Sequence, residues 1–280
     1  MSPEKVTVYI GTSGYSFADW SKVFYPAGLP KSKWLEYYVR HFPSLELNTS
    51  YYCIPAKSTI KRLVDETPPR YPVMVKANGE TTHKYNDADI SARFRESIDP
   101  LVETDRLRGV LAQFPWSFRN TPKNRDYIAQ MVQRTPDVTW FVEFRRREWI
   151  VPEVGNLLRE LGAGFVSVDE PQISGMMPPV AKFTIPVAYI RLHGRNSEAW
   201  WSGDPGSGRD RYDYRYNSEE LDFWARKVLK LAGDVREMFV FFNNCHEGQA
   251  VDNAVMMRNM LRQLAGKVAG DKDTPELVIS

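Results

Sequence analysis

The sequence has few cysteines and no long apolar stretch. Its two cysteines, Cys53 and Cys245, lie far apart and in no C-x-x-C arrangement, which argues against a disulfide framework and is typical of a reducing cytosol. No apolar run approaches the ~20 residues of a membrane span, and the opening M-S-P-E-K-V-T-V contains no apolar signal segment. We therefore expect a cytoplasmic protein that has no membrane partner.

The sequence also lacks a strong excess of either charge. Lysine and arginine number 37 against 35 acidic residues, for a net charge of +2. Proteins that bind nucleic acid or anionic membranes usually carry a clear basic excess. The charge balance therefore disfavours a nucleic-acid partner, although a local basic patch stays possible, and it says nothing about oligomeric state.

Eight short apolar segments with strand character alternate with amphipathic segments along the chain. Near-continuous apolar strands are typical of a parallel sheet buried on both faces. Helical spacing of apolar residues occurs over 34–42, 60–64, 94–102, 127–132, 154–161, 221–229 (after a Ser218 N-cap) and 251–264. The expected strands are Val6–Ile10, Leu45–Asn48, Val73–Lys76, Gly109–Phe114, Thr139–Arg145, Gly164–Asp169, Val187–His193 and Met238–Asn244.

Eight strands that alternate with helices predict a protein of the α/β class. The predicted fold is a single eight-stranded parallel (β/α)₈ TIM-type barrel. We expect residues 1–266 to form the barrel and 267–280 a polar C-terminal tail. The rival is a doubly wound open sheet. That fold usually has a glycine-rich fingerprint after its first strand, of which G-T-S-G (11–14) is only a part. We expect no cofactor.

Polar side chains stand at the end of every expected strand. In V-A-Y-I-R-L-H-G-R (187–195), strand alternation places Tyr189, Arg191 and His193 on one face. Strand ends of a barrel meet in one mouth, where the active sites of this fold lie. The polar strand-end residues are Ser13, Glu46, Asn48, Lys76, Gln113, Glu143, Arg145, Asp169, Arg191, His193, Asn243 and Asn244.

These residue types suit acid–base chemistry on an anion. Either Glu143 with Glu46, or His193 with Asp169, could form the catalytic acid–base pair. Positively charged groups would hold a phosphate or carboxylate, and amides would orient hydroxyl groups. The candidate binding residues are Arg145, Arg191, Lys76, Gln113, Asn48, Asn243, Asn244, Ser13 and the loop residues His83, Tyr15 and Trp20. The long loop Asn196–Tyr216 has the character of a lid.

Two other interpretations of the charged residues stay open. The acids and bases could form a neutral ion-pair network that plugs the barrel. Glu46, Glu143, Asp169 and His193 could instead bind a divalent metal, but three basic side chains in the same mouth would compete for the carboxylates. We therefore expect no metal.

The ordered motifs resemble the YecE-like family, also called domain of unknown function 72. They are G-T-S-G-Y (11–15), E-L-N-T-S-Y-Y (46–52), T-T-H (81–83), Q-F-P (113–115), E-F-R (143–145), R-L-H-G-R (191–195) and F-N-N (242–244). The resemblance implies a TIM-type barrel and a site at the polar strand ends and His83. It implies no settled reaction. Tyr15 departs from the tryptophan usual in the family.

The leading hypothesis is a metal-independent enzyme acting on a small polar anion, such as a phosphorylated sugar or a nucleotide-like molecule. Hydrolysis is preferred over isomerisation. The alternatives are a non-catalytic protein that binds a ligand or partner, and a divalent-metal isomerase or phosphodiesterase.

Overall fold

The sheet contains nine parallel strands and is curled. The computed structural model describes residues 5–85, 88–201, 210–268 and 276–280. The strand order is β2-β3-β4-β5-β6-β7-β8-β1-β9. The strands are β1 (Lys5–Thr12), β2 (Leu45–Leu47), β3 (Val73–Lys76), β4 (Leu107–Gln113), β5 (Trp140–Glu143), β6 (Gly164–Asp169), β7 (Val187–Leu192), β8 (Glu237–Phe242) and β9 (Glu276–Ile279). All eight expected strands are therefore present, in a TIM-barrel-like order.

The prediction of a closed eight-stranded barrel is confirmed only in part, because the sheet stays open between β2 and β1. These strands meet at one parallel bridge, Ser13 with Glu46, where the Gly14 N–H donates to the Glu46 carbonyl at 2.9 Å. The other half of the β1 edge is paired with β9, in the register Lys5 to Glu276 through Val8 to Ile279. Because β9 occupies this edge and β2 has only three residues, the two strands cannot form a full ladder.

The ninth strand lies in the segment that we expected to be a polar tail. Residues 269–275 of that segment lie outside the described residues, but Glu276–Ile279 pair with β1, and the Ser280 N–H donates to the Val8 carbonyl at 3.1 Å. Three apolar residues in E-L-V-I suit a strand, yet four residues are too few for sequence periodicity to reveal one.

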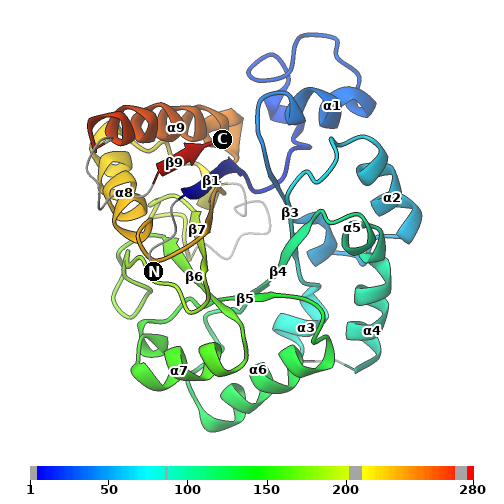
Figure 1. Ribbon diagram of the computed structural model, residues 1–280, viewed down its shortest axis with the longest axis vertical. Coiled ribbons are helices and arrows are strands. Elements are labelled where there is room, and N and C mark those ends of the chain that lie inside the picture. The colour runs from blue at the N-terminus through cyan, green and yellow to red at the C-terminus, as the bar shows by residue number, and fades with distance from the viewer. Residues whose placement is uncertain (1–4, 86–87, 202–209, 269–275) are drawn as a thin grey trace.

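Helices surround the sheet on its outer side (Figure 1). Their buried residues fall on the expected apolar faces, as in α2 (Ile60, Leu63, Val64). The expected Ser218 N-cap is wrong, because Asn217 caps α8 in a capping box with Glu220. The described α-helices are α1 (Trp34–Val39), α2 (Lys57–Asp65), α3 (Gly79–His83), α4 (Ala88–Ser97), α5 (Asp99–Glu103), α6 (Pro122–Arg134), α7 (Pro152–Glu160), α8 (Ser218–Leu231) and α9 (Gln249–Val268). No helix in the described ranges combines the length and apolarity needed to cross a membrane.

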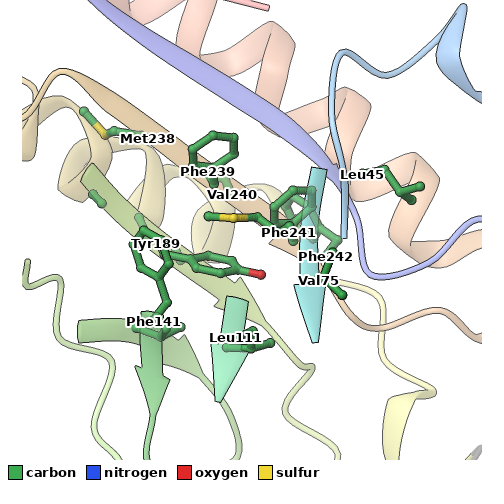
Figure 2. Close-up of a cluster of buried hydrophobic side chains, with 14 of the residues drawn as sticks. Leu45, Val75, Leu111, Phe141, Tyr189, Met238, Phe239, Val240, Phe241 and Phe242 are labelled. Carbon is green, nitrogen blue, oxygen red and sulfur yellow. The ribbon is translucent and has the colours of Figure 1, made fainter. Parts of the chain in front are cut away.

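Aromatic rings fill the interior of the curled sheet below the strand ends. The Phe141 ring lies at 5.3 Å from Tyr189, and Tyr189 lies at 5.7 Å from Phe241 (Figure 2). Space for Phe141 comes from glycine on both neighbouring strands, because a Cβ at Gly109 or Gly164 would lie 2.4 or 2.2 Å from its ring. This packed layer supports the polar residues that follow it along the strands.

Candidate functional site

Arg191 is the centre of the polar cluster above the aromatic layer. It is fully buried on β7, and its Nε and Nη2 donate to the two Glu46 carboxylate oxygens at 2.8 and 2.7 Å. Its Nη1 donates to Glu143 Oε2 at 2.6 Å and to Gln113 Oε1 at 3.3 Å. A bidentate guanidinium–carboxylate pair is a strong and directional contact. Four of the five guanidinium N–H groups of Arg191 are therefore directed at protein acceptors.

Both glutamates in contact with Arg191 are ionised. Burial opposes their charge, but Arg191 outweighs it and lowers the pKa of Glu46. Tyr189 also donates its hydroxyl to Glu46. Arg191 and Arg145 together hold the pKa of Glu143 well below its usual value. These carboxylates are fixed counter-ions at neutral pH, which makes them poor proton donors.

His193 is neutral and held on two sides. Asn243 Nδ2 lies 2.9 Å from His193 Nδ1, and Glu143 Oε1 lies 3.1 Å from Nε2. Burial, assisted by the charge of Arg145, lowers the pKa of His193 to about 3. If the amide donates to Nδ1, the ring proton lies on Nε2 and is donated to Glu143. The histidine is thus committed to the cluster rather than poised to titrate near pH 7.

Asp169 and Glu170 face opposite directions at the end of β6. Successive residues of a strand point to opposite faces. Asp169 accepts from Arg195 Nε at 2.9 Å and Nη2 at 3.1 Å, away from the cluster. The contact between His193 and Asp169 is made by the backbone alone: the His193 backbone N–H donates to the Asp169 backbone carbonyl at 2.8 Å. The predicted His193–Asp169 pair is therefore not joined through its side chains, and the acid that enters the cluster is Glu170.

Glu170 is fully buried and bound to Arg145. Arg145 Nη1 donates to Glu170 Oε2 at 2.6 Å, and its Nη2 lies 2.8 Å from Glu143 Oε1. The Met177 N–H donates to the other Glu170 oxygen at 3.1 Å. Burial raises the pKa of Glu170 to about 7, against the lowering effect of Arg145. Arg145 thus bridges two carboxylates, while its guanidinium carbon lies 5.6 Å from the Trp200 ring.

Lys76 differs from the other basic residues of the cluster. It ends β3, is partly exposed, and donates to Gln113 Oε1 at 2.9 Å with its Nζ 4.5 Å from the Tyr51 ring centroid. No carboxylate in the described ranges forms an ion pair with it. Burial and the positive charges of Arg191 and Arg145 lower the pKa of Lys76 to about 7. Lys76 is therefore held by an amide oxygen and an aromatic ring, where Arg145 and Arg191 are held by carboxylates.

The other predicted residues divide between the edge of the cluster and the scaffold. His83 lies on α3 rather than in the expected loop, 5.2 Å from the Tyr51 ring, and burial near Lys76 lowers the pKa of His83 to about 4. Asn48 is partly exposed, and its buried Oδ1 has no hydrogen-bond partner among the described residues. Ser13 reaches the cluster through its bridge to Glu46.

Trp20, Asn244 and Tyr15 make contacts that hold the scaffold. Trp20 is fully buried and donates its indole N–H to the Cys245 carbonyl at 2.8 Å. Asn244 Nδ2 donates to the Tyr214 carbonyl at 2.7 Å and to Asn253 Oδ1 at 2.9 Å. The partly buried Tyr15 has its ring 6.0 Å from Tyr38, and its carbonyl accepts from the Tyr25 hydroxyl. Burial therefore gives Trp20 a packing role in place of the predicted ligand contact.

Sequence reasoning missed several residues of the cluster. Glu170 directly follows Asp169 at the expected strand end. Because successive residues point to opposite faces, only one of these two acids can point inward. Strand alternation placed Tyr189 on the face of Arg191 and His193, but Tyr189 was not counted among the candidate site residues, although its hydroxyl donates to Glu46. Part of the predicted lid lies outside the described residues, at 202–209. Within its described part, Trp200 stands between Arg145 and Arg211, at 5.6 and 5.4 Å from their guanidinium carbons.

The inward carboxylates of the cluster are all bound to arginines. In the described ranges, no three His, Cys, Asp or Glu side chains are grouped as a metal ion would require. Glu46, Glu143 and Glu170 each accept from an arginine, so a metal would have to displace a guanidinium. Lys76 instead offers an uncommitted ammonium or amine.

The fold and the site define an α/β protein with a TIM-barrel-like sheet and a buried charge cluster at its carboxyl-terminal strand ends. A family model described as "Protein of unknown function DUF72" matches residues 9–277. The chain belongs to this family, as the resemblance to the YecE-like proteins indicated.

Relatives of known sequence or structure cover most of the chain. The UPF0759 protein YunF of Bacillus subtilis (strain 168) is 32% identical over 269 residues, 91% of this chain and 94% of that protein. A DUF72 family protein from Thermotoga maritima MSB8 is 38% identical with a TM-score of 0.84, over 91% of this chain and 99% of that structure. One from Enterococcus faecalis V583 is 28% identical with a TM-score of 0.81, over 91% and 95%.

Proposed function

We propose that this protein is an enzyme that performs acid–base chemistry on a small polar anionic substrate at the carboxyl-terminal strand ends. The observation that carries the proposal is the state of Lys76, a partly exposed strand-end cation that forms no ion pair with a carboxylate in the part of the chain that the structure describes. A group that titrates near the working pH is the most effective proton donor or acceptor. Lys76 and Glu170, each with a pKa of about 7, meet this condition.

The roles differ from those expected from the sequence. Glu143 and Glu46 are locked as anions and His193 as a neutral ring, so they position the cluster rather than transfer protons. Arg191 and Arg145 maintain the framework, and contact with the substrate anion falls to Lys76. Because the contacts favour neither hydrolysis nor isomerisation, the proposal extends only to proton transfer.

Binding of inorganic phosphate tests the anion site. A charge-assisted hydrogen bond contributes about 1.5–3 kcal/mol, which corresponds to roughly a 10–150-fold change in affinity. We expect calorimetry to show this loss for Lys76→Met and no loss for Lys61→Met, a matched control at an exposed lysine of α2. Equal affinity in all three proteins would contradict the role of Lys76.

Turnover separates the enzyme from a protein that only binds its ligand. The cluster could be a rigid, neutral framework for ligand binding, since its arginines and glutamates are mutually paired. We would assay a panel of phosphorylated sugars and nucleotides for product formation by mass spectrometry. Turnover that is lost in Lys76→Met supports the enzyme, whereas phosphate binding without turnover of any panel member favours the binding protein.

A further inference from the structure

The Lys76 amine is held at a defined position by two neighbours, Gln113 and Tyr51. Its Nζ is anchored at 2.9 Å from Gln113 Oε1 on β4, and it lies over the Tyr51 ring at 4.5 Å. Gln113 is itself tied to Arg191 Nη1 at 3.3 Å, which connects the amine to the buried cluster. An anchored, partly exposed amine at a strand end is placed like a reactive group rather than like a solvated surface lysine.

The charges around Lys76 disfavour a second positive charge. Burial is the largest cause of the lowered pKa of Lys76. Arg191 from β7 and Arg145 beyond β5 lower this pKa further, while Glu143 from β5 and Glu46 from β2 raise it. Both carboxylates bind the same guanidinium, that of Arg191, and Glu143 also lies 2.8 Å from Arg145 Nη2. The remaining facing groups are uncharged at neutral pH, because the pKa of His83 is about 4 and burial raises the pKa of the Tyr51 hydroxyl.

Amines that are crowded by other cations act as nucleophiles. An ammonium has no lone pair, so a lysine attacks a carbonyl carbon only in its neutral form, and a neighbouring cation is one way to obtain that form at neutral pH. A lysine that merely bound an anion would gain from keeping its full charge. The paired carboxylates and unpaired amine therefore suit covalent chemistry better than a simple electrostatic contact.

We propose that Lys76 forms a Schiff base with the carbonyl carbon of a small anionic aldehyde or ketone. The Nζ lone pair forms the N–C bond as the carbonyl π electrons move to oxygen. The carbinolamine then loses that oxygen as water, with the two protons of the original amine, to leave a C=N double bond. Protonation of the imine nitrogen by solvent gives an iminium ion, which withdraws electrons from the adjacent carbon. No oxidant, reductant or metal takes part. This inference rests on the proposed enzymatic site and narrows its substrates to carbonyl compounds.

Reductive trapping tests the proposal directly. The full-length protein would be incubated with glyoxylate, a small anionic aldehyde, and sodium cyanoborohydride, and the modified lysines would be located by peptide mass spectrometry. At pH 7 an amine with a pKa of about 7 is half neutral, whereas an ordinary lysine amine is neutral in about one molecule in 10³. Lower basicity reduces intrinsic nucleophilicity, so we expect Lys76 to be labelled at least about tenfold more than Lys61 at pH 7.

Variants distinguish the imine from the anion site. Gln113→Leu removes the anchor and should lower the labelling of Lys76 without changing that of Lys61. Lys76→Arg retains a positive charge but no primary amine, so it should keep phosphate binding while losing turnover of a carbonyl substrate. Labelling of Lys76 that does not exceed labelling of Lys61 would overturn the Schiff base. If Lys76 showed no excess labelling but phosphate affinity still fell in Lys76→Met, the proposed anion site would stand without the Schiff base. If phosphate affinity were also unchanged in Lys76→Met, both proposals would fail.

Discussion

Replacement of Arg191 by methionine is the sharpest test of the charge cluster. Methionine is unbranched and uncharged and replaces only the aliphatic part of arginine, so the substitution removes the guanidinium and leaves its buried partners. Glu46 loses its contacts at 2.7 and 2.8 Å and keeps the hydroxyl of Tyr189. Glu143 loses one contact at 2.6 Å but retains Arg145 at 2.8 Å. The uncompensated group is therefore Glu46.

Removal of one partner from a buried ion pair usually costs about 3–5 kcal/mol, because the other charge stays buried without compensation. We expect Arg191→Met to lower the free energy of unfolding by about that amount near pH 8. Such a loss leaves a folded protein when the starting stability is in the usual range of about 5–15 kcal/mol. The double variant Arg191→Met/Glu46→Gln should recover about 1–3 kcal/mol, since it removes the unpaired charge.

The loss of unfolding free energy in Arg191→Met, here called the deficit, must also depend on pH. In the unaltered protein the pKa of Glu46 is lowered, so its contribution to stability is present above the unfolded pKa of about 4.3 and is lost as the pH falls. Without Arg191, burial raises the pKa of Glu46 above the unfolded value, and its contribution is lost as the pH rises. The deficit of Arg191→Met should consequently be larger at pH 8 than at pH 5.

Urea unfolding at the two pH values, followed by circular dichroism, measures this deficit. Arg62→Met on α2 is the matched control, because its ion pair with Glu66 is at the surface, at 3.8 Å, and such pairs contribute about 0–1 kcal/mol. The reasoning would be refuted if Arg191→Met behaved like this control. It would equally fail if the deficit were the same at both pH values.

Three further outcomes follow from the contacts. Because the pKa of Glu170 is raised, its contribution to stability is fully present below the unfolded pKa of about 4.3 and is lost as the pH rises through about 7. In urea titrations, the free energy of unfolding of Glu170→Gln should therefore fall less between pH 5.5 and 8 than that of the unaltered protein. Trp20→Phe leaves the Cys245 carbonyl without its indole donor and should cost about 1–3 kcal/mol while phosphate affinity stays unchanged by calorimetry. Deletion of 276–280 uncovers the β1 edge and should raise amide hydrogen exchange at the Lys5–Val8 end of β1, whereas equal protection would contradict the pairing with β9.

Much of the fold was readable from local patterns. The segment around Phe141 and the segment ending in Arg191 are both apolar with a polar residue on alternate inward positions near the end, and period-two alternation is a property of the chain itself. The same rule placed His193 and Glu143 at the inward carboxyl ends of their strands, but the sequence paired His193 with Asp169, whereas the structure joins His193 Nε2 to Glu143 Oε1 at 3.1 Å. Helix faces followed from the spacing of apolar residues in the same way.

The pairing of charges depends on tertiary structure. The Glu46 and Arg191 side chains come from strands 145 residues apart, so only the curl of the sheet could show that these charges satisfy each other and leave Lys76 free. At the end of β6 it is Glu170, and not Asp169, whose side chain binds Arg145 in the cluster, and Trp20 is fully buried. The sequence by itself determined where strands and polar ends occur, because burial and alternation are local. Which of those polar groups remain available for chemistry was decided by the folded structure, because electrostatic pairing depends on distances in space.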